Sequence, residues 1–227
     1  MTEPLAAPAA GLRDVKVWDG LLRITHWSFP LLIPAMWWTA ENSKWALHRQ
    51  IGLALLGLLV FRVLWGFLGP ETARFSSFVK GPVAVIAYLR GAVANPIGHS
   101  PLGGWSTVAL LGAMLLQVSM GLFAGDPYDG MTGPLNPLVG VAIADTITEL
   151  HETFFWVVAG LIGLHLVAIT FYAVRGDDLL SPMIGGDRPP MAGVEGIGPM
   201  PWGRAGLAVV LAAGFALWVA YGAPPLT

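Results

Sequence analysis

The sequence predicts an all-α integral membrane protein, built as a four-helix transmembrane bundle with a fifth transmembrane helix toward its C-terminal end. Of its 227 residues, 55% are hydrophobic and only 11% are charged, with a mean hydropathy of +0.66. Soluble domains carry about 25% charged residues, so this composition is typical of membrane proteins. Five apolar stretches approach the length of about 20 residues with which a helix crosses a bilayer.

Charge and cysteine content exclude several functions. The formal net charge is −2, which argues against a nucleic acid partner. The chain has no cysteine, which excludes disulfides, iron–sulfur clusters, covalently attached c-type haem and Cys-ligated zinc. The first 22 residues carry charges and lack an apolar run, so we expect no cleavable signal peptide.

The expected elements follow one another with clear local signals. Asp19 can N-cap a first span that reaches Trp38 and is kinked by Pro30 and Pro34. A polar turn at 41–44 follows. The later elements are a second span at Trp45–Phe67, a polar connection at 69–104 with an interfacial helix starting at Gly81-Pro82, a third span at Trp105–Phe123, a loop at Ala124–Glu149, a fourth span at Leu150–Tyr172 and a fifth at Ala205–Ala220.

The distribution of Lys and Arg predicts the topology. If the N-terminus is cytoplasmic, ten of the twelve basic residues lie inside and only Lys44 and Arg49 lie outside. We therefore expect a multi-pass protein of the bacterial cytoplasmic (inner) membrane with a periplasmic C-terminus. Its segments would be a cytoplasmic tail (1–18), the four-helix domain (19–175), a Gly/Pro-rich linker (176–203), the fifth transmembrane helix (204–222) and a C-terminal tail (223–227).

Two histidines in the fourth span point to a function. His151 and His165 are 14 residues apart, which puts them on one helix face about 21 Å apart along the axis. That spacing places one histidine near each boundary of a hydrocarbon core about 30 Å thick. Intramembrane histidines normally face a bundle interior and act there. Two on one face is the pattern expected of a helix that carries two stacked haems.

An antiparallel bundle supplies each of these histidines with a partner. The start of the first span lies beside the end of the fourth, so His26 should face His165 at the inner haem. The start of the second span lies beside the start of the fourth, so His48 should face His151 at the outer haem. Four histidines at complementary depths therefore predict two haems, each placed between two histidines. His99 lies outside the spans, and we interpret it as a loop residue rather than a ligand.

Three arginines are candidates for the haem propionates. Arg62 follows His48 by 14 residues and so reaches the level of the inner haem, where Arg23 precedes His26 by three residues. Arg49 is placed to serve the outer haem in the same way. An intramembrane arginine is a natural partner for a carboxylate, although Arg62 also fits a residue that only snorkels toward the interface.

Other metal chemistry fits less well. His151-Glu152 is not followed by the second histidine of an HExxH zinc motif. No span carries the Glu-x-x-His set of a di-iron bundle, and no thiolate is present for copper. No Gly-rich phosphate loop or nucleophile elbow appears.

The sequence resembles the bacterial cytochrome b561 family, which is related to the b-type cytochrome subunits of nickel–iron hydrogenases and formate dehydrogenases. The resemblance covers roughly residues 16–186 in order, and Ser100 replaces a common Asn. It implies four core helices that hold two b haems, with the ligands mapping onto His26, His48, His151 and His165. The stretches that carry it are VWDGLLRITHW (Val17–Trp27), WALHRQIGLALLGLLVFRVLWGFLG (Trp45–Gly69), ARFSSFVKGPVAVIAYLRG (Ala73–Gly91), GHSPLGG (Gly98–Gly104), TELHE (Thr148–Glu152) and SPMIGG (Ser181–Gly186).

The resulting expectation is a transmembrane dihaem cytochrome of a respiratory chain, an electron-transfer protein or a quinone/quinol oxidoreductase. The resemblance implies quinone as one redox partner. The other would be a c-type cytochrome or a peripheral dehydrogenase, docked on the acidic loop around Asp126–Glu149 (Asp126, Asp129, Asp145 and Glu149). Two alternatives stay open: the haem-bearing membrane anchor subunit of a larger hydrogenase- or dehydrogenase-type complex, and a haem-free membrane transporter that uses buried histidines for protons.

Overall fold

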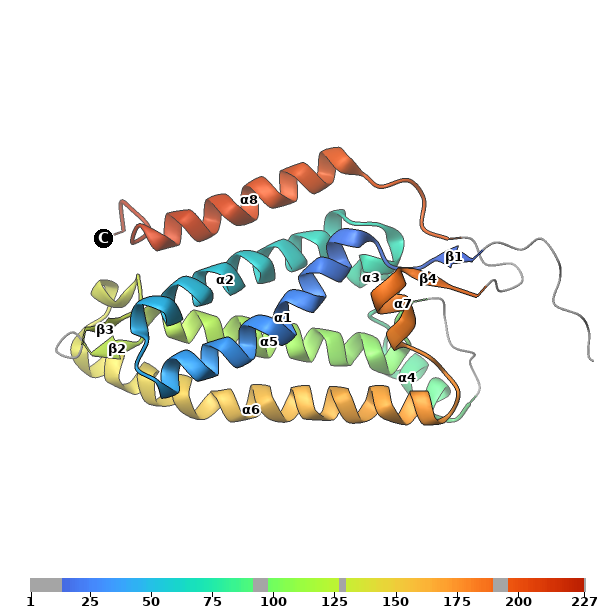
Figure 1. Cartoon of the computed structure of the whole chain (residues 1–227), viewed down its shortest axis with the longest axis horizontal. Coiled ribbons are helices and arrows are strands. Elements are labelled where there is room, and N and C mark those ends of the chain that lie inside the picture. The colour runs from blue at the N-terminus through green and yellow to red at the C-terminus, as the bar shows by residue number, and fades with distance from the viewer. Residues whose placement is uncertain (1–13, 92–97, 127–129, 190–195, 227) are drawn as a thin grey trace, which may run out of the picture.

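In the described part of the chain, five long helices run side by side along the long axis of the molecule, and consecutive ones point in opposite directions (Figure 1). The computed structural model describes residues 14–91, 98–126, 130–189 and 196–226. The long helices are α1 (Gly20–Glu41), α2 (Trp45–Leu68), α5 (Pro101–Phe123), α6 (Val141–Val174) and α8 (Trp202–Ala220).

Short elements cap the two ends of the bundle. At one end, β1 (Val15–Lys16) pairs with β4 (Asp187–Arg188), and we call this the clasp end. At the other, β2 (Gly125–Asp126) pairs with β3 (Met131–Thr132), and we call this the hairpin end. The clasp end also holds α3 (Phe75–Phe78), α4 (Pro82–Leu89), α7 (Leu180–Gly185) and the 3-10 turn Glu71–Ala73, and a second 3-10 turn, Asn136–Leu138, lies at the hairpin end.

Four of these helices are long and apolar enough to cross a membrane: α2, α5, α6 and α8. The chain is therefore a multi-pass membrane protein of helical-bundle type. The fourth of these candidates is the C-terminal helix expected from the sequence. By contrast, α1, which contains Arg23, His26, Pro30 and Pro34, is not among the four.

The predicted start of α1 is confirmed, whereas the predicted start of α6 is too late in the sequence. Asp19 N-caps α1 as predicted, because its carboxylate accepts a hydrogen bond from the amide of Leu22 at 2.9 Å. The prediction of a loop up to Glu149 was wrong for residues 141–149, because α6 begins at Val141, directly after Gly140. At about 1.5 Å per residue, the 34-residue α6 is about 51 Å long. It therefore exceeds a hydrocarbon core of about 30 Å.

The long helices pack as two pairs with an added fifth helix. α1 packs on α2, α6 packs chiefly on α5, and α8 lies along α2 (Figure 1). The small buried residues of α8, Ala205, Ala208 and Ala212, allow its close approach to α2. Midway along the bundle, Leu59 of α2, Met114 of α5 and Val158 of α6 form a buried apolar cluster. This cluster is part of the buried core between α2, α5 and α6.

The start of the predicted linker is structured instead. In the segment 176–203, α7 and β4 fold back onto the beginning of the chain, where the amides of Val17 and Trp18 both donate to the carbonyl of Gly186, at 2.8 and 3.0 Å. The indole of Trp27 donates to the carbonyl of Met183 at 3.0 Å. These bonds hold the segment after α6 against the first turns of α1.

Two facing histidine pairs as the candidate functional site

The hairpin-end pair joins α2 to α6. The rings of His48 and His151 face each other with their centres 6.3 Å apart and their planes at 84°. Metal–imidazole bonds are about 2 Å long, so this separation leaves room for one metal atom bonded to a nitrogen of each ring. The two histidines are brought together as the antiparallel arrangement predicted.

Backbone carbonyls fix both rings of this pair. Nδ1 of His48 lies 3.0 Å from the carbonyl oxygen of Met36, and Nδ1 of His151 lies 2.9 Å from that of Gln117. A carbonyl oxygen only accepts hydrogen bonds, so each Nδ1 must carry the proton. Each Nε2 is then left with its lone pair free, which is the state a metal-binding histidine requires.

Two polar side chains reinforce these contacts. The hydroxyl of Thr39, which is completely buried, donates to the carbonyl of Met36 at 2.8 Å and lies 3.1 Å from Nδ1 of His48. The amide of Gln117 donates to the carbonyl of His151 at 2.8 Å. Sequence reasoning assigned neither residue a role. The available signal was that Gln117 is the only strongly polar side chain in its span.

A cavity of about 590 Å³ surrounds the hairpin-end pair. Its walls are mostly apolar side chains of α1, α2, α5 and α6, with Arg49, Glu41 and Glu152 among them. Gly121 opens it on the α5 side, because a Cβ there would stand 2.9 Å from Cε1 of His151. Its size and its apolar lining with few polar groups are those of a cofactor pocket.

The clasp-end pair joins α1 to α6. The ring centres of His26 and His165 are 6.5 Å apart and their planes are inclined at 58°. Nδ1 of His26 is buried and has no hydrogen-bond partner among the described residues. No described residue is hydrogen-bonded to the ring of His165 either. The two pairs thus have similar spacing but differ in what holds their rings.

Buried charges surround the clasp-end pair. Arg62 is 5% exposed and lies within electrostatic range of His26, at the level that its spacing from His48 predicted. Asp19 is 1% exposed, accepts a hydrogen bond from the indole of Trp65 at 3.0 Å and is the charge that acts on Arg62. Arg23 donates to the carbonyl of Ile184, while its Nε is buried without a partner in the described part of the chain.

His99 is a loop residue, as expected, and it also belongs to the surroundings of the clasp-end pair. Its ring packs between Trp18 and Phe78, at centre distances of 4.8 and 4.4 Å. Burial, followed in size by the charges of Arg62, His165 and His26, lowers the pKa of His99 to about 3. The ring is therefore neutral at physiological pH.

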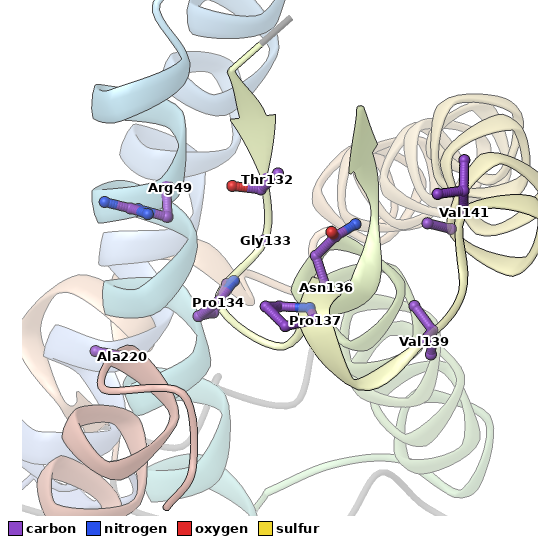
Figure 2. A pocket seen from close by; sticks show the side chains of 10 residues that line it. Arg49, Thr132, Gly133, Pro134, Asn136, Pro137, Val139, Val141 and Ala220 are labelled. Carbon is purple, nitrogen blue, oxygen red and sulfur yellow. The ribbon is translucent and has the colours of Figure 1, made fainter. Parts of the chain in front are cut away.

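Arg49 lies between the histidine cavity and a second recess at the hairpin end. This recess has a volume of about 550 Å³, and its walls come from α2, the 132–139 loop, the start of α6 and Ala220 at the end of α8 (Figure 2). Arg49, Thr132, Gly133 and Pro134 line both spaces. The predicted outer arginine therefore lies at the edge of the hairpin-end site.

The residues present fit two b haems. Each pair offers two imidazoles and no further ligand, because no group of three or more His, Cys, Asp or Glu gathers as a metal site in the described part of the chain. Two axial donors are what a haem iron needs, since the porphyrin supplies its other bonds. Each pair also has an arginine nearby that can bind a propionate.

Comparison with known proteins agrees with this geometry. The model of the prokaryotic cytochrome b561 family matches residues 17–186, which run from the turn before α1 to the residue before β4 and exclude α8. No curated protein and no solved structure matches the chain. The family match covers well over half of the sequence and includes all four paired histidines. The chain therefore belongs to the prokaryotic cytochrome b561 family, and it is a transmembrane b-type cytochrome of electron transfer.

Proposed function

We propose that the protein carries electrons across the membrane on two b haems. His26 and His165 would be the axial ligands of one, and His48 and His151 those of the other. The observation that carries the proposal is the presence of two facing histidine pairs, with ring centres 6.5 and 6.3 Å apart, at opposite ends of one bundle interior.

The chemistry follows from this donor set. When bound, a haem supplies an iron that gains or loses one electron. With two histidines bound, no axial position is free for oxygen, which suits electron transfer rather than oxygen chemistry. The protein's contribution is to hold the imidazoles, to exclude water through the apolar walls and to set the local electrostatics. The buried apolar residues Leu59, Met114 and Val158 are among those walls at the hairpin-end site.

Arginines would hold the propionates. Arg62 and Arg23 serve the clasp-end site in this proposal, and Arg49 serves the hairpin-end site. Arg62 is supported best, because it is buried beside His26, and a propionate would give it a second anion besides Asp19. The guanidinium can bind a carboxylate through two parallel hydrogen bonds.

The proposed orientation makes the clasp end cytoplasmic and the hairpin end periplasmic. The excess of Lys and Arg at the clasp end supports it. It requires α1 to cross the inner membrane as well, giving five spans and a periplasmic C-terminus. The dihaem domain would then comprise 19–175 together with the α7–β4 segment, and α8 would be a separate fifth span.

The partners follow from the same orientation. Quinone in the membrane is the proposed substrate at one side. At the periplasmic side, Asp145 and Glu149 are exposed and lie four residues apart on one face of the α6 extension. We propose that they help to dock a cationic c-type cytochrome or a peripheral dehydrogenase. Asp129, the other acid expected there besides Asp126, lies outside the described residues.

An optical spectrum of the purified full-length protein tests the proposal. We expect a reducible b-type signal equal to two haems per chain. Replacing His48 and His151 with Ala should leave one haem, and so should replacing His26 and His165. His99→Phe is the matched control and should retain both.

Each other outcome has a meaning. A protein without haem would overturn the proposal in favour of a haem-free transporter. Quinol-dependent reduction of the isolated protein would support the role in the quinone pool. Copurification with a stoichiometric metalloenzyme, without such activity, would instead make the chain the anchor subunit of a larger complex.

A further inference from the structure

The two histidine pairs differ in the hydrogen bonds that their rings make. At the hairpin end, both Nδ1–H groups donate to backbone carbonyls, at 3.0 Å from His48 and 2.9 Å from His151. At the clasp end, Nδ1 of His26 is buried without a described partner. The difference is built into the backbone of α1 and α5, since the acceptors are the carbonyls of Met36 and Gln117.

This difference acts on a bound metal. An imidazole whose Nδ1–H donates to an oxygen becomes more electron-rich at Nε2 and is a stronger ligand. A stronger donor stabilises the oxidised iron more than the reduced iron, and this lowers the reduction potential. The ligand hydrogen bonds therefore lower the potential at the hairpin end relative to the clasp end.

The charges around the two sites also lower the reduction potential at the hairpin end relative to the clasp end. At the clasp end, the cations Arg23 and Arg62 face one anion, Asp19. At the hairpin end, the cavity is lined by the anions Glu41 and Glu152 and one cation, Arg49. A nearby cation favours the reduced state because that state holds the extra electron. The effect of Arg62 is weakly screened, since its side chain is buried.

We propose that the haem held by His48 and His151 has the lower reduction potential of the two. This inference rests on the proposed function, since it needs a haem at each pair. An electron on the hairpin-end haem would then pass to the clasp-end haem. Such a transfer would be a one-electron exchange, in which the iron held by His26 and His165 would gain the electron that the iron held by His48 and His151 loses. Met36, Gln117 and Arg62 are the positioning residues that set this difference between the two reduction potentials.

Optical redox titration of the full-length protein with both haems bound tests the inference. We expect two reduction steps in the wild type. Arg62→Gln should shift the higher step to lower potential, because it removes a cation from the clasp-end site. Arg204→Gln, which removes an exposed cation at the start of α8, is the matched control and should leave the higher step unchanged. A tenfold change in the ratio of reduced to oxidised haem would appear as a shift of about 59 mV for one electron.

Single-haem variants give an independent assignment. The protein with His26→Ala and His165→Ala should retain the hairpin-end haem and titrate at the lower potential. The protein with His48→Ala and His151→Ala should titrate at the higher one. The reverse order, equal potentials, or a shift of the lower step in Arg62→Gln would each overturn the inference while leaving two haems per chain. Fewer than two haems in the wild type would instead refute the proposed function.

Discussion

Gln117 and His151 are joined by two hydrogen bonds that run in opposite directions between α5 and α6. The side-chain amide of Gln117 donates to the carbonyl of His151 at 2.8 Å. Nδ1–H of His151 donates to the carbonyl of Gln117 at 2.9 Å. The same residue therefore fixes both the position of α6 and the orientation of a proposed haem ligand.

Replacing Gln117 with Leu should weaken this junction. Losing one hydrogen bond costs about 1 kcal/mol, which lowers the midpoint of thermal unfolding by about 2–4 °C for a chain of this size. We also expect the reduction potential of the hairpin-end haem to rise as the contact of Nδ1 loosens. Thermal melts and redox titration measure the two effects. Ser119→Ala, an exposed polar position on the same helix, should change neither.

Asp19 should be among the most sensitive positions at the clasp end. Its carboxylate caps α1 through the amide of Leu22 and accepts the indole N–H of Trp65. Asp19→Ala removes a cap worth about 1 kcal/mol and leaves a buried N–H unsatisfied at about 1–3 kcal/mol. We expect a loss of about 2–4 kcal/mol in unfolding free energy, measured by denaturant titration of the haem signal. Asp14→Ala, which changes an exposed neighbour, should have the same free energy of unfolding as the wild type within experimental error.

His99 should make the fold sensitive to acid. Its pKa is lowered from 6.5 to about 3, chiefly by burial, so below pH 6.5 the unfolded chain binds a proton that the folded chain does not. Stability is then fully present above pH 6.5 and falls as the pH is lowered toward 3. His99→Phe keeps a buried ring and should show a smaller loss of unfolding temperature between pH 7.5 and pH 5. An equal loss of unfolding temperature in the wild type and in His99→Phe over this pH range would contradict this expectation.

Neutralising the acidic face of α6 should slow electron exchange with a cationic partner. The double variant Asp145→Asn and Glu149→Gln removes two exposed charges at the hairpin end. Electrostatic steering changes association rates by about 10-fold or more, so we expect a slower second-order rate at low salt and little difference at high salt. Stopped-flow mixing with a soluble basic c-type cytochrome measures it. The control is Glu71→Gln, which changes an exposed acid at the clasp end and should leave the rate unchanged. If the double variant also reacted at the wild-type rate, the docking proposal would be wrong.

The sequence was sufficient to pair the histidines. The 14-residue interval from His151 to His165 translates directly into depth and azimuth, because helix geometry is fixed. An antiparallel bundle then leaves one partner for each. The boundary at Asp19 was equally readable, since a capping carboxylate has a local signal.

Other features left no such signal. The acceptors for His48 and His151 are backbone carbonyls, which any residue type would supply. The start of α6 at Val141 was missed because the polar residues Asp145, Thr146, Thr148 and Glu149 separate its short apolar first turn from the long apolar run that begins at Leu150. The contact of Val17 and Trp18 with Gly186 joins residues about 170 positions apart, and no short-range pattern predicts it. Thr39 is buried in α1, and nothing in the sequence around it marks this threonine as a hydrogen-bond partner of a histidine.

The β1–β4 pair has a consequence for the order in which the protein is made. It joins Val15–Lys16 to Asp187–Arg188, so the chain from α1 to α7 closes on itself before the α8 segment is needed. Domains generally fold as units during synthesis, starting from the N-terminal side. The core of α1, α2, α5 and α6 can therefore fold before α8 is synthesised. The helix α8 would then pack along α2 last. A protein shortened after β4 should still fold its bundle of α1, α2, α5 and α6 and form the β1–β4 pair.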